Sequence, residues 1–315
     1  MIYSFNYHPY KRHFRKPLNT SHGLWRIREG IIISLKDDRG KIGWGEIAPI
    51  PWFGSETLEQ GLNLCHKLGE KVTKEDIDQI SDRLPACQFG FESALESLLS
   101  WEQNSRSFFN ERKMKYSYLL PAGKEVLAAW EKISQQYPLP ITLKWKIGVY
   151  PLDVEIEIFR QLSQVLPSEV KLRLDANGGL KLSQIQHWLD ITDKMGNVEF
   201  IEQPLPPQEL EIMLGLNQNY MTPLALDESV ATLKQLEDAY HRGWKGIYVI
   251  KAAIAGSPRR LRQFILQNPI DAVFSSVLET KIGRESAIKL AKELSNPERA
   301  LGFGVNHWFI EEKEE

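Results

Sequence analysis

Short β-rich runs recur along the chain from about residue 114, and longer segments of mixed polar and apolar residues separate them. The eight runs are KYSYLL (115–120), ITLKWK (141–146), VKLRLD (170–175), VEFIE (198–202), PLALD (223–227), GIYVIK (246–251), DAVFS (271–275) and ALGFG (300–304). From the second run to the eighth, successive ends lie 24 to 29 residues apart, the length of one strand, one helix and two loops. Strands that alternate with helices form parallel βαβ units, and eight such strands predict an α/β fold with a (β/α)7β TIM-like barrel over residues 114–304.

An open, doubly wound sheet is the competing fold, because it is built from the same parallel units. Such a sheet usually carries a glycine-rich turn after its first strand. After KYSYLL the chain reads PAGKEV, which contains one glycine. The barrel is therefore the favoured prediction.

Residues 1–113 have a different pattern and predict a separate α+β domain ahead of the barrel. IREGIIISLKDDRGKIGWGEIAP (27–49) predicts two antiparallel strands joined by a turn at residues 38–40. SETLEQGLNLCHKLGEKV (55–72) and FGFESALESLLSWEQ (89–103) have helical periodicity. Only a short tail, residues 305–315, follows the last strand, and we expect it to pack back on this first domain.

Composition excludes several classes of protein. The net charge is −2, so the chain lacks the basic excess that nucleic-acid binding requires. The longest apolar runs are far shorter than a membrane span, and the N-terminus does not resemble a secretory signal. Cys65 and Cys87 form no CxxC pair, which favours free thiols in a reducing cytoplasm. These features predict a cytoplasmic protein that acts on a small molecule, without membrane or nucleic-acid partners.

Charged residues stand at the ends of five successive runs, where a buried strand would carry apolar side chains. They are Lys146, Asp175, Glu202, Asp227 and Lys251. Parallel strands are buried on both faces, so solvation is a poor explanation for five such ends in a row. In a parallel barrel the C-terminal strand ends form the mouth, where active sites lie. The pattern therefore predicts a functional site.

Three of these charges are carboxylates on consecutive strands: Asp175, Glu202 and Asp227. Neighbouring strands lie about 4.8 Å apart, so the three groups can converge, and unpaired they would be very costly to bury. A divalent cation removes that cost, and all-oxygen ligation favours Mg²⁺, with Mn²⁺ as a substitute. The alternative is salt bridging to Lys146, Lys251 and Arg173, without a metal. Arg173 lies one layer below Asp175, and we expect it to be a buried charge partner for the carboxylates.

The segment ITLKWKIG (141–148) places Lys144 and Lys146 in a run that otherwise has the pattern of a buried strand. Side chains two positions apart share one face of a strand. An exposed edge strand would explain this segment alone, but the neighbouring strand ends indicate a site. Lys146 and Lys251 are expected to face each other across the mouth. A partly desolvated lysine beside another cation has a lowered pKa and can act as a base, so Lys144 is expected to tune Lys146 or bind a substrate carboxylate.

Five segments that carry these charges resemble the enolase superfamily in order and spacing, in its muconate-lactonizing branch with a K-x-K motif. The segments are TLKWKIG, LRLDANGG, FIEQPL, LALDES and YVIKAA. GWGEIAP (43–49) is similar to the N-terminal capping domain of the same families. The resemblance implies Mg²⁺ on the three carboxylates, Lys146 as the acid/base and Lys251 as its opposite partner. Such sites remove a weakly acidic proton next to a carboxylate, and the metal holds the resulting enediolate.

Two further segments, NTSHGLWRIREG (19–30) and FSSVLETKIG (274–283), resemble the o-succinylbenzoate synthases. The first is similar to their flexible capping-domain loop and the second to their seventh-strand segment, which implies substrate contacts from Arg26, Ser275 and Ser276. The implied reaction is dehydration of 2-succinyl-6-hydroxy-2,4-cyclohexadiene-1-carboxylate during menaquinone or phylloquinone synthesis. Lys146 would remove the ring proton and protonate the leaving hydroxyl on the same face, while Lys251 stays protonated.

Related activities remain open at this point. An N-succinylamino acid racemase would keep the same metal site. A dipeptide epimerase typically carries D-x-D in its eighth strand, whereas ALGFGVNHW has no acid. Muconate cycloisomerase has no feature in its favour, and the five mouth charges argue against a catalytically silent interaction protein. Asn177, two positions after Asp175, is a candidate substrate ligand, although Asn-Gly-Gly is also ordinary turn chemistry.

Overall fold

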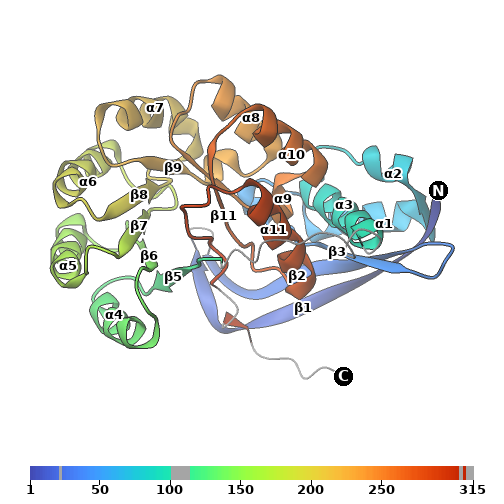
Figure 1. The fold of residues 1–315 in the computed structure, drawn as a ribbon, viewed down its shortest axis with the longest axis horizontal. Helices are drawn as coiled ribbons and strands as arrows, with labels where there is room; N and C mark the ends of the chain where they lie inside the picture. Colours follow the sequence, from blue (N-terminus) through green and yellow to red (C-terminus); the bar gives the residue numbers. More distant parts are fainter. Residues whose placement is uncertain (21–22, 101–113, 305–307, 310–315) are drawn as a thin grey trace.

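The computed structural model describes residues 1–20, 23–100, 114–304 and 308–309. Two β-sheets organise this part of the chain, an antiparallel sheet near the N-terminus and a longer parallel sheet after it (Figure 1). The boundary predicted at residue 113, two residues of the 19–30 loop, and most of the 305–315 tail lie outside the described residues.

The first sheet has four strands in the order β3-β2-β1-β4, and its pairs are antiparallel. Its elements are β1 (Ile2–Thr20), β2 (Gly23–Lys36), β3 (Ile42–Ile47) and β4 (Lys71–Thr73), with helices α1 (Leu58–Leu68), α2 (Lys74–Asp78) and α3 (Pro85–Ser100). The predicted hairpin over residues 27–49 is present as β2 and β3. Thr57 begins α1 with a capping box, in which its hydroxyl and the Gln60 side chain each satisfy a backbone amide.

Helix α3 lies directly against β3, and glycines make this possible. A Cβ atom at Gly45 would clash with the carbonyl oxygen of Gly90, and one at Gly43 with that of Ala94. Side chains alternate between the two faces of a strand, so Trp44 and Glu46 point away from α3. The GWGE segment is thus a strand whose glycine face receives a helix backbone.

The second sheet has seven parallel strands in the order β11-β10-β9-β8-β7-β6-β5. They are β5 (Ser117–Leu120), β6 (Thr142–Lys146), β7 (Lys171–Asp175), β8 (Val198–Glu202), β9 (Leu224–Leu226), β10 (Ile247–Ile250) and β11 (Asp271–Phe274). Each corresponds to one predicted run. The eighth run, residues 300–304, forms only single parallel bridges, from Leu301 to Tyr116 and from Gly302 to Ser275.

Helices follow the strands and lie on the outer side of the curled sheet (Figure 1). They are α4 (Glu125–Gln136), α5 (Leu152–Val165), α6 (Leu182–Met195), α7 (Leu210–Asn219), α8 (Leu233–His241), α9 (Ala252–Ala255), α10 (Pro258–Gln267) and α11 (Lys281–Leu294). Their apolar residues recur at helical spacing and face the sheet, where the rings of Trp145, Phe159 and Trp188 meet edge to face. A smaller apolar cluster on β8 to β11 includes Phe200, Ile247 and Val273. The parallel strands are therefore packed on both faces, as predicted.

Part of the predicted tail contact lies within the described residues. Phe309 pairs with Phe14 of β1 through an antiparallel bridge, and their rings stack with centroids 4.8 Å apart. The guanidinium of Arg12 lies 3.7 Å from the centroid of the Phe309 ring.

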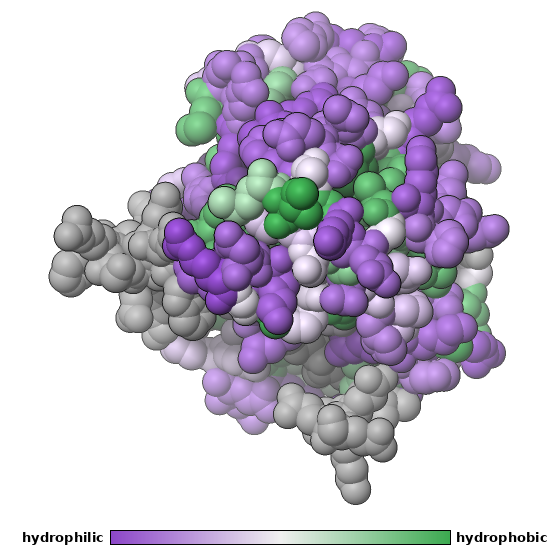
Figure 2. All heavy atoms as spheres, turned by 90° about the vertical axis from the view of Figure 1, so that its right-hand side faces the viewer, coloured by the Kyte–Doolittle hydropathy of each residue, from purple (hydrophilic) through white to green (hydrophobic). Residues whose placement is uncertain are grey.

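The described surface is mostly hydrophilic on the face that Figure 2 shows, with a few apolar side chains near its centre. None of the helices in the described ranges has the length and apolar character needed to cross a membrane.

Candidate active site

The predicted charged residues meet at the C-terminal ends of neighbouring strands. Strand pairing places Lys146 level with Asp175, and Asp175 level with Glu202. Asp227 and Lys251 come directly after the last residues of β9 and β10. One edge of the parallel sheet therefore carries all five.

The three carboxylates are buried and each contacts a lysine. Nζ of Lys144 lies 2.7 Å from Oδ2 of Asp175 and 2.8 Å from Oε1 of Glu202. Nζ of Lys251 donates to both carboxylate oxygens of Asp227. Glu202 is 1% exposed, so its charge has almost no access to water. The cluster holds more negative charge than two ammonium groups neutralise.

The pKa values of the carboxyl groups reflect their burial first and the neighbouring charges second. Burial, together with the charge of Asp175, raises the pKa of Glu202 to about 8. Burial also raises the pKa of Asp227 to about 6, although Lys251 opposes the change. Burial acts in the same direction on Asp175, but the charge and hydrogen bond of Lys144, the charge of Lys251 and the Asn177 amide together outweigh it, and the pKa of Asp175 is lowered. Two of the three acids thus hold protons more tightly than usual.

The donor set fits a hard divalent cation. It consists of carboxylate oxygens alone, which is the ligation that Mg²⁺ prefers, and a cation there would offset the burial that raises the pKa of Glu202 and Asp227. Within the described ranges, no three His, Cys, Asp or Glu side chains are arranged closely enough to hold a metal ion as they stand. The ammonium groups of Lys144 and Lys251 instead supply the positive charge in contact with the carboxylates.

A fourth carboxylate, Glu228, lies beside the predicted three and was missed. Its Oε1 accepts a hydrogen bond of 3.2 Å from Nδ2 of Asn177, and its buried Oε2 has no partner among the described residues. The backbone amide of Asn177 donates to Oδ1 of Asp175. Asn177 is therefore at the site, with its amide engaged by Glu228. The sequence did offer a signal for Glu228, because this acid directly follows Asp227 in the segment LALDES.

Two other buried side chains, also missed, fix the strand ends. The Gln203 side-chain oxygen accepts from the backbone amides of Asp227 (2.9 Å) and Ser229 (3.0 Å). The Glu155 carboxylate accepts from three consecutive amides just after β6, those of Gly148, Val149 and Tyr150. These bonds hold the segments that follow Lys146 and β9.

The two candidate catalytic lysines have different surroundings. Lys146 is half-buried, and its ammonium group makes no hydrogen bond or ion pair with the described part of the chain. Nζ of Lys251 lies 4.1 Å from the centroid of the Phe53 ring, in addition to its bonds with Asp227. Phe53 lies between β3 and β4 of the first sheet in the chain, so the N-terminal part of the protein reaches this site.

Arg173 does not pair with the three carboxylates, so the prediction of its partner was wrong. Its Nε lies 2.6 Å from Oε2 of Glu199, whose other oxygen binds Arg299 at 2.9 Å. The pairing of β7 with β8 shifts between Leu172 and Arg173. This irregularity brings Glu199 to Arg173, below the site.

The remaining predicted residues divide into two groups. Ser275 and Ser276 directly follow β11, where their hydroxyls donate to the Gly302 carbonyl (3.3 Å) and to Oε2 of Glu279 (2.8 Å). Arg26 is exposed on β2, and its guanidinium makes no hydrogen bond or ion pair with the described residues. Arg28, two positions later, is buried and binds the Val277 carbonyl. Sequence reasoning did not single out Arg28.

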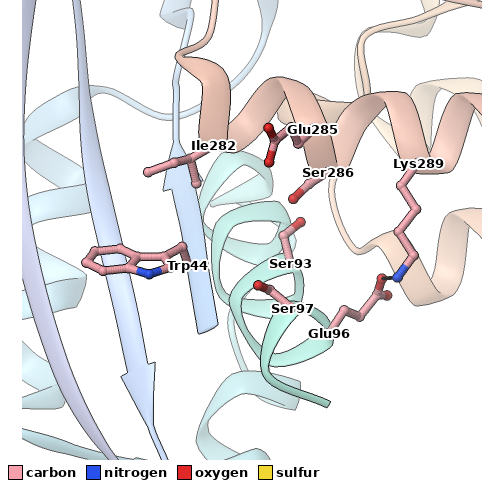
Figure 3. Close-up of a pocket in the computed structure, with 8 residues that line it drawn as sticks. All are labelled: Trp44, Ser93, Glu96, Ser97, Ile282, Glu285, Ser286 and Lys289. Atoms are coloured by element: carbon pink, nitrogen blue, oxygen red, sulfur yellow. Dashed lines mark ion pairs between the residues drawn. The ribbon is translucent and has the colours of Figure 1, made fainter. Parts of the chain in front are cut away.

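A separate pocket of about 450 Å³ lies between β3, α3 and α11 (Figure 3). Trp44, Glu96, Ile282 and Lys289 are among the residues that line it, and Lys289 pairs with Glu96 at 3.8 Å. It contains none of the strand-end charges and is the seam between the N-terminal part and α11.

The fold and the strand-end charges define an enolase-type protein, and comparison with known proteins agrees. Residues 132–267 match the family described as Enolase C-terminal domain-like, and residues 18–98 match the family described as MenC, N-terminal domain. The o-succinylbenzoate synthase of Thermosynechococcus vestitus is 39% identical, over 95% of this chain and 91% of that protein. The chain belongs to the o-succinylbenzoate synthase family.

Solved structures give the same result. The o-succinylbenzoate synthase from Thermosynechococcus elongatus BP-1, complexed with Mg in the active site, superposes with a TM-score of 0.87 and 38% identity, covering 97% of this chain and 94% of that one. The L-Ala-D/L-Glu epimerase from Bacillus subtilis has a TM-score of 0.75 and 21% identity, covering 97% and 90%. At that identity the second likeness shows the fold alone.

Proposed function

We propose that this protein is an o-succinylbenzoate synthase, a hydro-lyase that dehydrates 2-succinyl-6-hydroxy-2,4-cyclohexadiene-1-carboxylate to o-succinylbenzoate in menaquinone or phylloquinone biosynthesis. One observation carries the proposal: a chain 39% identical to a synthase of that name has buried carboxylates and lysines on successive strand ends. The proposal includes a small-molecule carboxylate as the substrate and a cytoplasmic location, which the free buried thiols of Cys65 and Cys87 favour.

Asp175, Glu202 and Asp227 would hold Mg²⁺, with Mn²⁺ as a substitute. The support is their shared strand edge, their all-oxygen donor set and the Mg in the active site of the structure from Thermosynechococcus elongatus. When bound, Mg²⁺ supplies positive charge that stabilises negative charge developing on the substrate carboxylate. Asn177 and Glu228 lie next to these ligands and would orient them.

Lys146 is the proposed base and acid. Proton and hydroxyl leave from the same face of the ring, so one ammonium group can remove the first and protonate the second. The support is that Lys146 stands level with Asp175 and has no bonding partner in the described ranges. Lys251 is proposed to remain a fixed cation, held by Asp227 and covered by Phe53. Lys144 would balance the charge of Asp175 and Glu202.

The domain division is part of the proposal. Residues 114–304 would close as a (β/α)7β barrel, because the bridges at Leu301 and Gly302 touch the two edges of the parallel sheet. Residues 1–113 would form the capping domain, with residues 305–315 packed on it, and the Phe14–Phe309 contact favours this. Residues 19–30, expected as a flexible loop, belong in their described part to the end of β1 and the start of β2, and this hairpin end would cover the mouth and exclude water.

Racemisation of N-succinylamino acids and dipeptide epimerisation are the alternatives. Both need two lysines that exchange protons, one on each face of the α-carbon. The named epimerase structure is 21% identical, compared with 38% for the synthase structure. The synthase reaction is therefore the better supported function.

Incubation of the purified protein with the cyclohexadiene substrate and Mg²⁺ tests the proposal, with the aromatic product followed by ultraviolet absorbance. Chelation should stop the reaction, and Mg²⁺ or Mn²⁺ should restore it. N-succinylamino acids in D₂O provide the parallel test. Turnover that survives exhaustive chelation, or deuterium exchange at both enantiomers as fast as dehydration, would contradict the assignment.

A further inference from the structure

The loop between β11 and α11 carries Ser275 and Ser276 past the end of the parallel sheet. Pairing of Ile250 with Phe274 places the start of this loop beside Lys251. Leu278 has φ of 64°, a left-handed conformation that is strained for leucine and persists only where surrounding contacts impose it. Contacts within the loop and contacts from the first sheet hold it in this conformation.

Glu279 holds the loop from within. Its Oε2 accepts from the Ser276 hydroxyl at 2.8 Å and from the Val277 amide at 2.6 Å. The Ser276 hydroxyl in turn accepts from the amide of Leu278. These bonds form one tight turn, but they do not fix its place relative to the rest of the protein.

Arg28 of β2 contacts the loop from the N-terminal sheet. It is 1% exposed, and Nε donates to the Val277 carbonyl at 3.1 Å. Its terminal nitrogens donate to the carbonyls of Ala48 (2.5 Å), Pro49 (2.8 Å) and Glu29 (2.7 Å). No carboxylate pairs with Arg28 in the described ranges. A buried guanidinium is costly without full hydrogen bonding, so these carbonyls are held where it needs them.

Glu46 of β3 contacts the far end of the same loop. It is fully buried, and its carboxylate accepts from the amides of Thr280 and Gly283 at 2.9 Å each and from the Thr280 hydroxyl. These amides form the start of α11, where a negative charge is stabilised by the helix dipole. Glu46, on the antiparallel sheet, thus caps α11, the helix that follows the last strand of the parallel sheet.

Tyr10 of β1 joins the two contacts. Its hydroxyl donates to Oε1 of Glu46. Burial and the Glu46 carboxylate raise the pKa of Tyr10, and the charge of Arg28 opposes them, so the three groups are neighbours. The cation binds a carbonyl at one end of the loop, and the anion binds amides at the other. Three adjacent strands of the first sheet supply these groups, which we call the Arg28–Tyr10–Glu46 clamp.

We propose that the Arg28–Tyr10–Glu46 clamp fixes the 276–280 loop in the conformation that binds the substrate, so that these three act as positioning residues for substrate affinity. The inference deepens the proposed function and rests on it for the identity of the substrate. Arg28 also holds residues 48 and 49, shortly before Phe53 on Lys251, so it joins two loops that border the site. None of the three is expected to take part in proton transfer.

The chain offers a matched control in Glu92. This buried carboxylate on α3 accepts from the Ser257 hydroxyl at 2.6 Å and from the Arg259 amide at 3.0 Å, at the start of α10. Glu92 therefore makes the same kind of contact as Glu46, but with α10 in place of α11. It does not touch the 276–280 loop.

Glu46→Gln, Arg28→Lys and Glu92→Gln are compared with the wild type by two measurements. The first is amide hydrogen exchange over residues 276–283 without substrate, and the second is steady-state kinetics with the cyclohexadiene substrate and Mg²⁺. We expect Glu46→Gln and Arg28→Lys to speed exchange in this segment and to raise KM roughly tenfold, with kcat within about threefold. Glu92→Gln should leave both the exchange of this segment and KM at wild-type values. Tyr10→Phe is the milder variant if Glu46→Gln does not fold, with a smaller change in the same direction.

Equal effects of Glu46→Gln and Glu92→Gln on KM would overturn the proposal. The Glu46 contact would then only attach the N-terminal sheet to the helices of the parallel sheet, without a specific effect on the 276–280 loop. Wild-type exchange over 276–283 in the Glu46 and Arg28 variants would also overturn it, as would faster exchange with unchanged KM. If the wild type does not dehydrate the substrate, the proposed function fails. The exchange measurement still decides in that case whether the clamp holds the loop.

Discussion

The ammonium group of Lys144 on β6 lies 2.8 Å from Oε1 of Glu202 on β8, across the intervening strand β7 and 58 positions away in the chain. The same ammonium group binds Asp175. Burial alone would lower the pKa of Lys144, but the charges of Asp175 and Glu202 outweigh it and the pKa is raised. Lys144 is thus a permanent cation at the base of the carboxylate cluster.

Removal of this cation should have opposite effects on the metal-free protein and on metal binding. Lys144→Met leaves two buried carboxylates without their partner, so the metal-free protein should lose about 3 kcal/mol of stability. Mg²⁺ should then bind more tightly, because a nearby positive charge is gone. Thermal unfolding with and without Mg²⁺ measures both effects. A smaller Mg²⁺-induced rise in Tm than in the wild type would contradict the prediction.

The raised pKa of Glu202 predicts a pH dependence of stability for the metal-free protein. The folded state holds this proton up to about pH 8, whereas the unfolded state releases it near 4.5. The folded state binds more protons between these values, so stability is greatest at the lower end and falls as the pH rises toward 8. Glu202→Gln mimics the protonated acid and should flatten the curve. Urea unfolding of chelated protein from pH 5 to 8 compares the two proteins, and identical slopes would refute the assignment to Glu202.

Arginine replacements separate the roles of the two lysines. Arginine keeps the positive charge but does not act as a base at working pH. Lys146→Arg should lower kcat for dehydration roughly 10³-fold or more, because the proton carrier is lost. Lys251→Arg should retain a measurable fraction, and neither variant should racemise an N-succinylamino acid. The idea fails if Lys251→Arg is as inactive as Lys146→Arg while both bind Mg²⁺ normally.

The contact of β3 with α3 predicts a large effect from one methyl group. Gly45→Ala places a Cβ against the Gly90 carbonyl, so the helix must move away, at a cost of about 2 kcal/mol or more. Gly215→Ala is the matched control, because a Cβ there meets nothing within 4 Å and the residue lies within α7. That change should be neutral or stabilise by up to about 1 kcal/mol. Denaturant unfolding distinguishes them, and equal stabilities would refute the packing argument.

Local pattern predicted the strands of the second sheet and the placement of the site. A buried parallel strand leaves a characteristic apolar run, so a charge at its end, such as Lys146, Asp175 or Glu202, is visible in the sequence. Parallel strands share one C-terminal edge, and this rule brings the charges together without knowledge of any long-range contact. The hairpin of β2 and β3 was predictable for a similar reason, because its turn and its alternation are local.

Partners were decided by the tertiary structure. Arg173 binds Glu199 because the register of β7 and β8 shifts by one position, and no local pattern reports such a shift. Arg28, rather than Arg26, is buried because the loop after β11 covers that part of β2. The sequence does not distinguish Glu46 from other strand residues, because its partners are the amides of α11, which only the tertiary structure brings to it. Sequence periodicity determines which face of an element a residue occupies, but only packing determines which distant group meets that face.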